Sequence, residues 1–302
     1  MKPRSTTSRT AFTIVELGVA ILVVAALIGL LLVGVAQISR TAQAGAERQN
    51  VVALRIAVDQ FKADFGFLPP LMEDGILYSR SNPPDPTGTP PLMGAQLSVY
   101  DPGVPEDVEF LRRDTGTMGP DLRFSVYSLP TYLIGVQDFP VDGSSGPPVD
   151  GKAGPGFRTP TRSGTFRTLG GTLTDPLFDV RGDSERLVIV NPEEGRAELR
   201  DRSGVPYRFY RWLPDEQIGG PDPSKSVGDL LNVPAMVGDP AENVELRDAG
   251  YAIVAAGPNR VFGEMDTETV DRVIREVGRV GDGSDEASEA AGRADNIIEV
   301  GK

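Results

Sequence analysis

The sequence predicts an α+β protein, in which a long N-terminal helix packs on a C-terminal antiparallel sheet and a large loop-rich insertion separates the two. Three observations lead to this prediction. An apolar run near the N-terminus continues into an amphipathic helical pattern, and short strand-like runs lie in the C-terminal half. The region between them is rich in glycine and proline, of which the whole chain has 35 and 26, and these residues favour turns and loops.

The composition excludes several classes of function. With no histidine and no cysteine, the chain cannot form a disulfide, a Ser-His-Asp triad or a zinc site with imidazole or thiolate ligands. Its formal net charge of −13 disfavours nucleic acid as a partner, because the phosphates of nucleic acid are negative too. Most common hydrolase chemistry is therefore unavailable to this chain, and we expect a protein that is not an enzyme and requires no cofactor. Hard-cation sites built from oxygen ligands remain open.

The first forty residues have the pattern of a membrane segment. Leu17–Ala36 comprises 20 residues without a charged or strongly polar side chain, and a helix of that length spans about 30 Å, the thickness of a bilayer's hydrocarbon core. Residues 1–11, ahead of this run, contain Lys2, Arg4 and Arg9 and no acidic residue. We therefore expect a single transmembrane helix at about residues 17–39, with its N-terminus in the cytoplasm and the rest of the chain outside.

Glu16, at the edge of this apolar run, bears on three interpretations. A cleaved signal peptide has a shorter apolar core of roughly 7–15 residues. A plain signal anchor accounts for the length but not for a costly carboxylate at this position. Cleavage after Ala11 accounts for both, because Phe12 gains an α-ammonium group and Glu16 becomes the fifth residue of the mature chain. The two charges can then pair, within one helix or between stacked subunits, which lowers their cost in hydrocarbon.

The stretch Phe12-Thr13-Ile14-Val15-Glu16, followed by the apolar run, resembles the prepilin cleavage and methylation motif of type IV pilins and type II secretion pseudopilins. The resemblance implies a leader peptide at residues 1–11, cleaved between Ala11 and Phe12 by a prepilin peptidase. It also implies N-methylation of Phe12 and a role for Glu16 in assembly. Ala11 departs from the family, which usually has glycine before the cut.

The helical pattern continues beyond the apolar run. An apolar stripe with spacings of three and four residues predicts one buried helix face; it consists of Val51, Leu54, Val58, Phe61 and Phe65. Gly66 and the prolines at 69 and 70 are stop signals, so we predict one helix over residues 12–66. A dimeric coiled coil is the alternative explanation of the stripe. The segment 64–69 also resembles the Asp-x-Gly-aromatic-x-Pro turn that ends this helix in the major pseudopilin.

Residues 67–302 form the predicted globular domain, with the insertion at about 70–175. Strand-like runs follow at 186–190, 206–212 and 251–256. In the second run Arg208 and Arg211 alternate with aromatic residues, and we expect these two arginines on a solvated strand face.

Three C-terminal segments extend the resemblance. Residues 201–207, Asp-Arg-Ser-Gly-Val-Pro-Tyr, resemble the pseudopilin turn Asp-Pro-Trp-Gly-Asn-Pro-Tyr; residues 256–263 resemble that family's glycine-rich loop, and 294–298 its Asp-Asp-Ile ending. The family binds calcium between these loops, which implies Asp295 as the first candidate ligand. Asn259, Asp282 and Asp285 are further candidates. A solvated acidic loop is the alternative.

The resemblance implies a pseudopilin, a structural filament subunit of a type II secretion-type system that helps to drive protein export. The implied partners are other pilin-like subunits in homo- and hetero-filaments, the prepilin peptidase, the inner-membrane secretion platform and membrane lipid. The implied location is the bacterial inner membrane, with the C-terminal pilin-like domain in the periplasm and a periplasmic filament after assembly. The alternatives are a type IV pilus or competence pilin, and a membrane-anchored ligand-binding or enzymatic domain.

Overall fold

The computed structural model describes residues 14–72, 123–138, 148–162, 164–167, 170–180, 184–191, 196–214, 223–224, 231–263 and 284–302. The chain divides into two compact units, residues 1–45 and 46–302, and helix α1 (Ile14–Phe65) contributes to both. The leader expected at 1–11 lies outside the described residues, as do residues 73–122 and 139–147 of the expected insertion.

In the first unit, α1 exposes apolar side chains around its whole circumference. The large apolar side chains described between Leu17 and Leu31 are 49% to 69% exposed, including those at the four consecutive positions 21–24. In the first unit, the structure describes α1 side chains only for residues 17–29, 31 and 42–45. Within the part of the chain that the structure describes, no helix is long and apolar enough to cross a membrane.

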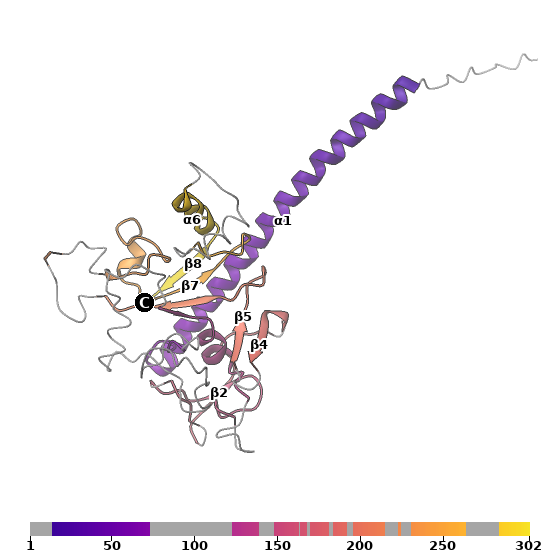
Figure 1. The fold of residues 1–302 in the computed structure, drawn as a ribbon. Coiled ribbons are helices and arrows are strands. Elements are labelled where there is room, and N and C mark those ends of the chain that lie inside the picture. The colour runs from indigo at the N-terminus through magenta and orange to yellow at the C-terminus, as the bar shows by residue number, and fades with distance from the viewer. Residues whose placement is uncertain are drawn as a thin grey trace, which may run out of the picture. The chain divides into compact units, whose positions relative to one another are not determined.

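The second unit is built around a four-stranded antiparallel sheet with the strand order β1-β6-β7-β8 (Figure 1). The strands are β1 (Phe124–Ser125), β6 (Arg208–Arg211), β7 (Tyr251–Ala255) and β8 (Ile297–Gly301). Strand β7 pairs with β6 on one side and with β8 on the other, so that Tyr251 lies opposite both Arg211 and Gly301.

Shorter elements surround this sheet. Two further pairs of strands are antiparallel: β2 (Phe157–Arg158) with β3 (Leu173–Thr174), and β4 (Leu187–Asn191) with β5 (Arg196–Leu199). In the described residues the shorter helical elements are the π-helix η1 (Pro130–Ile134), the 3-10 helices η3 (Ser184–Arg186) and η4 (Val244–Arg247), and the α-helix α6 (Asp285–Arg293).

Both faces of the sheet are covered. On one face, the apolar side chains of α1 from Val51 to Phe61 pack with Tyr251, Ile253 and Ala255 of β7. On the other face, Ala252 and Val254 of the same strand pack in a second cluster, with Trp212, Val237, Leu246 and Phe262. Because side chains alternate between the two faces of a strand, this double coverage buries all five residues of β7.

Helix α1 ends at Phe65, immediately before the glycine that we expected to stop it. Gly66 has a φ of 79°, and its amide donates to the Lys62 carbonyl at 2.8 Å. This left-handed residue satisfies one of the carbonyls that a helix end leaves open. The three strand-like runs correspond to β4, β6 and β7, whereas β5, β8 and α6 were not predicted.

Two expectations about the globular domain need correction. Leu129, Tyr132 and Leu133 are fully buried in the cluster that packs on α1, so this part of the 70–175 segment, which we expected to be a loop-rich insertion, belongs to the core. Arg208 does not lie on a solvated face, since its guanidinium carbon is 4.2 Å from the ring centroid of Phe124 and 3.9 Å from that of Phe262. Two aromatic rings hold this arginine by cation–π contacts.

Candidate functional site

The residues of the N-terminal motif are only partly described. Ala11 and Phe12 lie outside the described residues, so their cleavage and methylation stay predictions. Glu16 is the third residue of α1, which begins at Ile14. Its side chain lies outside the described part, and its assembly role is likewise a prediction.

The two C-terminal loops that carry the family resemblance contact each other. The Asn259 side-chain amide donates to the Gly292 carbonyl at 2.6 Å, and the Arg293 guanidinium donates to the Gly263 carbonyl at 2.6 Å. Gly257 has a φ of 70°, and a Cβ atom there would lie 2.2 Å from the Asp295 carbonyl oxygen. Only glycine therefore fits at 257, because any side chain would force the loops apart.

The calcium ligands inferred from the resemblance are not assembled in the described residues. Asp295 is exposed, and the Asn259 Oδ1 atom already accepts the Val261 amide at 3.1 Å. Asp282 lies outside the described residues, and of Asp285 only the backbone, at the start of α6, is described. No group of three acidic side chains that could hold a metal occurs in the described ranges, and calcium takes about six to eight oxygen ligands. The calcium site stays a prediction.

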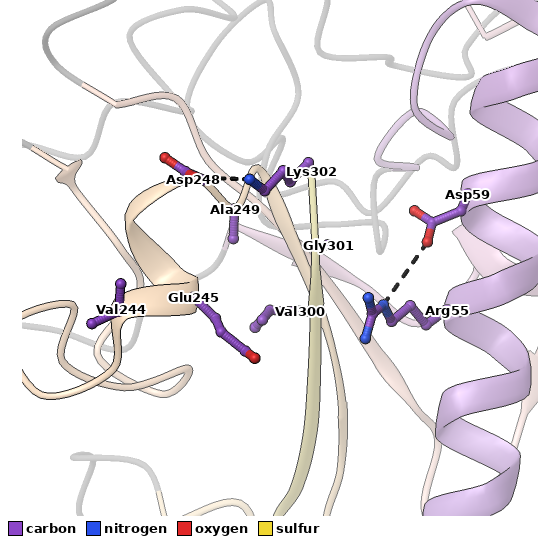
Figure 2. A pocket seen from close by; sticks show the side chains of 9 residues that line it. All are labelled: Arg55, Asp59, Val244, Glu245, Asp248, Ala249, Val300, Gly301 and Lys302. Atoms are coloured by element: carbon purple, nitrogen blue, oxygen red, sulfur yellow. Dashed lines mark hydrogen bonds and ion pairs between the residues drawn. The ribbon is translucent and has the colours of Figure 1, made fainter.

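A cavity of about 460 Å³ lies beside the end of β8, between α1 and η4. Figure 2 shows Arg55 and Asp59 on the α1 side and Val244, Glu245 and Asp248 on the η4 side, with β8 between them. Lys302 closes one end through a 2.8 Å ion pair with Asp248. Five charged side chains line this cavity together with the apolar side chains of Val244, Ala249 and Val300, whereas small-molecule sites are lined predominantly by apolar and aromatic side chains.

The same region fastens α1 to the last strand. The Arg55 guanidinium lies 3.3 Å from the Glu299 carboxylate of β8, and the Lys62 ammonium donates to the Lys302 carbonyl at 2.7 Å. The Tyr251 hydroxyl, from the central strand, donates to Asp59 Oδ1 at 2.6 Å. We call these contacts the C-terminal seam. Ion pairs with side chains this exposed contribute at most about 1 kcal/mol each.

A second group of polar contacts, which the sequence did not reveal, lies at the start of the second unit. We call Glu47, Arg186, Asp201 and Tyr207 the buried cluster, since none of the four is more than 8% exposed. The Tyr207 hydroxyl donates to Glu47 Oε1 and accepts from the Arg186 guanidinium, which also lies 3.3 Å from Glu47 Oε1. Glu47 Oε2 accepts the backbone amide of Arg202 at 3.1 Å.

Asp201 organises the turn that resembles the pseudopilin motif. Its Oδ1 atom accepts the amides of Ser203 at 2.8 Å and Val205 at 2.9 Å, and Gly204 supplies a φ of 85°. Asp201 and Gly204 therefore have structural functions in this turn. Tyr207, the last residue of the motif, reaches from it to Glu47 of α1. One feature of the sequence could have identified Glu47 as a buried residue. Glu47 precedes Val51 by four residues and therefore lies on the same helix face as the apolar stripe.

Comparison with protein-family models, with curated proteins and with solved structures found no match for this chain.

Proposed function

We propose that this chain is a pseudopilin, a filament subunit of a type II secretion-type system that α1 anchors in the bacterial inner membrane. The observation that carries the proposal is the Phe12–Glu16 motif placed at the start of a 52-residue helix, Ile14–Phe65. A leader that is cut at Ala11 would place the new terminus of the chain two residues before this helix begins.

The first unit supports the proposal through its exposed apolar surface. A helix that is apolar all round is stable only where lipid or other apolar helices cover it. The exposed side chains between Leu17 and Leu31 meet this description, and Leu17–Ala36 carries no charged side chain. Lipid would cover this surface before assembly, and the helices of neighbouring subunits would cover it in a filament.

The second unit supports the proposal through the way in which α1 is held. Its apolar face packs on an antiparallel sheet, and the turn and loops that resemble the pseudopilin family lie against α1 or against one another. In this proposal the domain carries no chemistry. It is the periplasmic body of the subunit, while Glu16 pairs with the Phe12 ammonium of a neighbour and sets the axial register.

The first test is the intact mass and N-terminal sequence of the chain purified from its native membrane. The proposal expects a chain that begins with N-methyl-Phe12. A chain that begins at Met1 would indicate a plain anchor, and one that begins near Gln37 a cleaved signal peptide. Either result would contradict the proposal, because Glu16 would then have no adjacent α-ammonium group.

The second test is the variant Glu16→Ala, followed by cross-linking of subunits in the membrane. We expect cross-linked multimers to be lost while the amount of chain in the membrane stays the same. Glu245→Ala, which removes an exposed acid far along the chain, is the matched control and should assemble as the wild type does. Normal assembly of Glu16→Ala would favour the anchored ligand-binding or enzymatic alternative.

A further inference from the structure

The buried cluster contains more negative than positive groups. Arg186 can balance one carboxylate, that of Glu47, through their 3.3 Å contact. Asp201 adds a second carboxylate, and its Oδ2 atom is buried with no hydrogen-bond donor among the described residues. A buried carboxylate oxygen without a donor is costly when ionised and much less so when protonated.

We propose that the buried cluster is a proton-sensitive latch, which holds the first residues of α1 in the second unit against the 201–206 turn. The latch is closed when Asp201 is protonated and loosened when Asp201 is ionised. The proposal concerns contacts within the second unit and does not depend on the filament function.

Asp201 is surrounded by charged groups from the elements that pack against its turn. Glu47 of α1 faces it with a negative charge and Arg186 of η3 with a positive one, and the neutral Tyr207 hydroxyl bonds to both of these groups. The neighbouring arginines do not neutralise the negative charge of the buried cluster. The Arg200 side chain pairs with Glu198 at 2.8 Å. Arg202 gives Glu47 only its backbone amide and is itself exposed.

Asp201 titrates in a pH range in which the protein can be studied. Burial raises the pKa of Asp201 to about 6, and the negative charge of Glu47 adds to this rise, while the amides of Val205 and Ser203 and the charge of Arg186 oppose it. A raised carboxyl pKa means that the closed state binds a proton more tightly than the open state. Closing is therefore favoured at acidic pH and loses this support as the pH rises from about 4 to about 6.

The link from Asp201 to α1 runs through Glu47. Glu47 Oε2 accepts the amide of Arg202, the residue next to Asp201, so both carboxylates bind the same short turn. When Asp201 is ionised, the two negative charges repel each other at low solvent exposure. That repulsion acts on the contact between α1 and the turn, whereas the C-terminal seam is held by other side chains.

Hydrogen exchange followed by mass spectrometry tests the latch on the full chain in detergent micelles. Exchange of peptides that cover residues 46–55 is followed from pH 4.5 to pH 8 and corrected for the intrinsic rate of each amide. In the open state the pKa of Asp201 has the ordinary value of an aspartate. Proton linkage then predicts that the protection of these amides falls about tenfold between pH 5 and pH 7.5 and stays constant above about pH 6.5.

Two variants separate the latch from general effects of pH. Asp201→Asn cannot ionise and should abolish the tenfold change in the protection of residues 46–55. All variants are compared in an Asp150→Asn background, because Asp150 has a raised pKa too. Asp175→Asn removes a carboxylate whose side chain is 97% exposed, and it should keep the tenfold change. Retention of the tenfold change in Asp201→Asn would overturn the proposal.

A further variant covers the case in which Asp201→Asn does not fold. Glu47→Gln removes the neighbouring negative charge and should move the plateau to lower pH, because Glu47 raises the pKa of Asp201. A wild-type chain in which the protection of residues 46–55 does not change between pH 5 and pH 7.5 would also overturn the proposal. Failure of the filament proposal has a different readout, namely a chain that starts at Met1.

Discussion

Replacing Glu47 by alanine tests whether the buried cluster fixes α1 to the rest of the second unit. The side chain of Glu47 is 5% exposed and that of its partner Arg186 is 9% exposed. Glu47 accepts from three groups: the Arg186 guanidinium, the Tyr207 hydroxyl and the Arg202 amide. Alanine leaves all three without this acceptor and leaves a positive charge in the interior.

The size of the effect follows from this geometry. Removing one partner of a buried ion pair costs about 3–5 kcal/mol, because the remaining charge is desolvated and uncompensated. A whole domain is stabilised by only about 5–15 kcal/mol. We therefore expect Glu47→Ala to remove a large part of the free energy of unfolding of the second unit, far more than the loss of an exposed ion pair such as that between Asp248 and Lys302.

The assay is urea unfolding in detergent, followed by the fluorescence of Trp212. This is the only tryptophan in the chain, and it is 2% exposed in the cluster on the face of the sheet away from α1. Its emission therefore reports unfolding of the sheet. A lower midpoint with an unchanged slope would show a loss of stability and not a change in the unfolded state.

A double variant gives the decisive comparison. Glu47→Leu combined with Arg186→Met removes both charges, and apolar replacement of a buried ion pair is often neutral or stabilising. We expect the double variant to be more stable than either single change. If Glu47→Ala costs less than about 1 kcal/mol, or if the double variant is the least stable of the set, the account of the cluster as a buried, mutually compensating network is refuted.

Three further substitutions test single positions, two in the second unit and one in α1 at the end of the first unit. Gly257→Ala should destabilise the second unit by several kcal/mol in the same assay, because the new Cβ would lie 2.2 Å from the Asp295 carbonyl at a φ of 70°. Gly45→Ala has no atom within 4 Å and should stabilise the helix by about 0.5–1 kcal/mol; equal effects of the two changes would contradict this argument. Burial raises the pKa of Asp150 to about 7, so this carboxyl alone should add about 2–3 kcal/mol to the stability of the wild type when the pH falls from 8 to 5, beyond the smaller contribution of Asp201. Asp150→Asn should lose most of that gain, and an unchanged pH dependence would show that Asp150 is not the group responsible.

The sequence was most informative where the structure depends on local pattern. The apolar stripe and Gly66 mark the buried face and the end of α1 because both arise from spacing and backbone conformation within one helix. The β6 and β7 runs are rich in aromatic and β-branched residues and end in turn residues, so their positions were predictable too.

The elements that were missed depend on pairing between distant segments. Strand β5 has the sequence Arg-Ala-Glu-Leu, whose residues favour helices, and it is a strand because Leu187–Asn191 pairs with it. Strand β8 is a strand because it pairs with β7. Its Gly301 leaves room for the Tyr251 ring of β7, which lies where a Cβ at residue 301 would be. For the same reason the contact of Glu47 with residues 139 and 160 positions away could not be deduced from spacing.

Arg208 illustrates why the charge of a side chain alone does not predict its environment in the fold. An arginine that alternates with aromatic residues along a strand fits a solvated face. This arginine instead lies over the rings of Phe124, from β1, and Phe262, from the loop after β7. The guanidinium group is weakly hydrated and planar, so it packs on aromatic rings at little cost.

The contacts of α1 within the second unit are distributed along this part of the helix. Glu47 fixes the first turn of this part of the helix through the buried cluster. Lys62 fixes its last turn to the Lys302 carbonyl, and Arg55, in the middle of this part of the helix, pairs with Glu299 of β8. The apolar face of the same part packs on the sheet. A pull along the helix axis is then shared by contacts at both ends, of which the seam is exposed and weak and the buried cluster is costly to break. If the filament proposal holds, a pull on α1 would load the cluster around Glu47, and a change in the protonation of this cluster would alter how firmly α1 is held within the second unit.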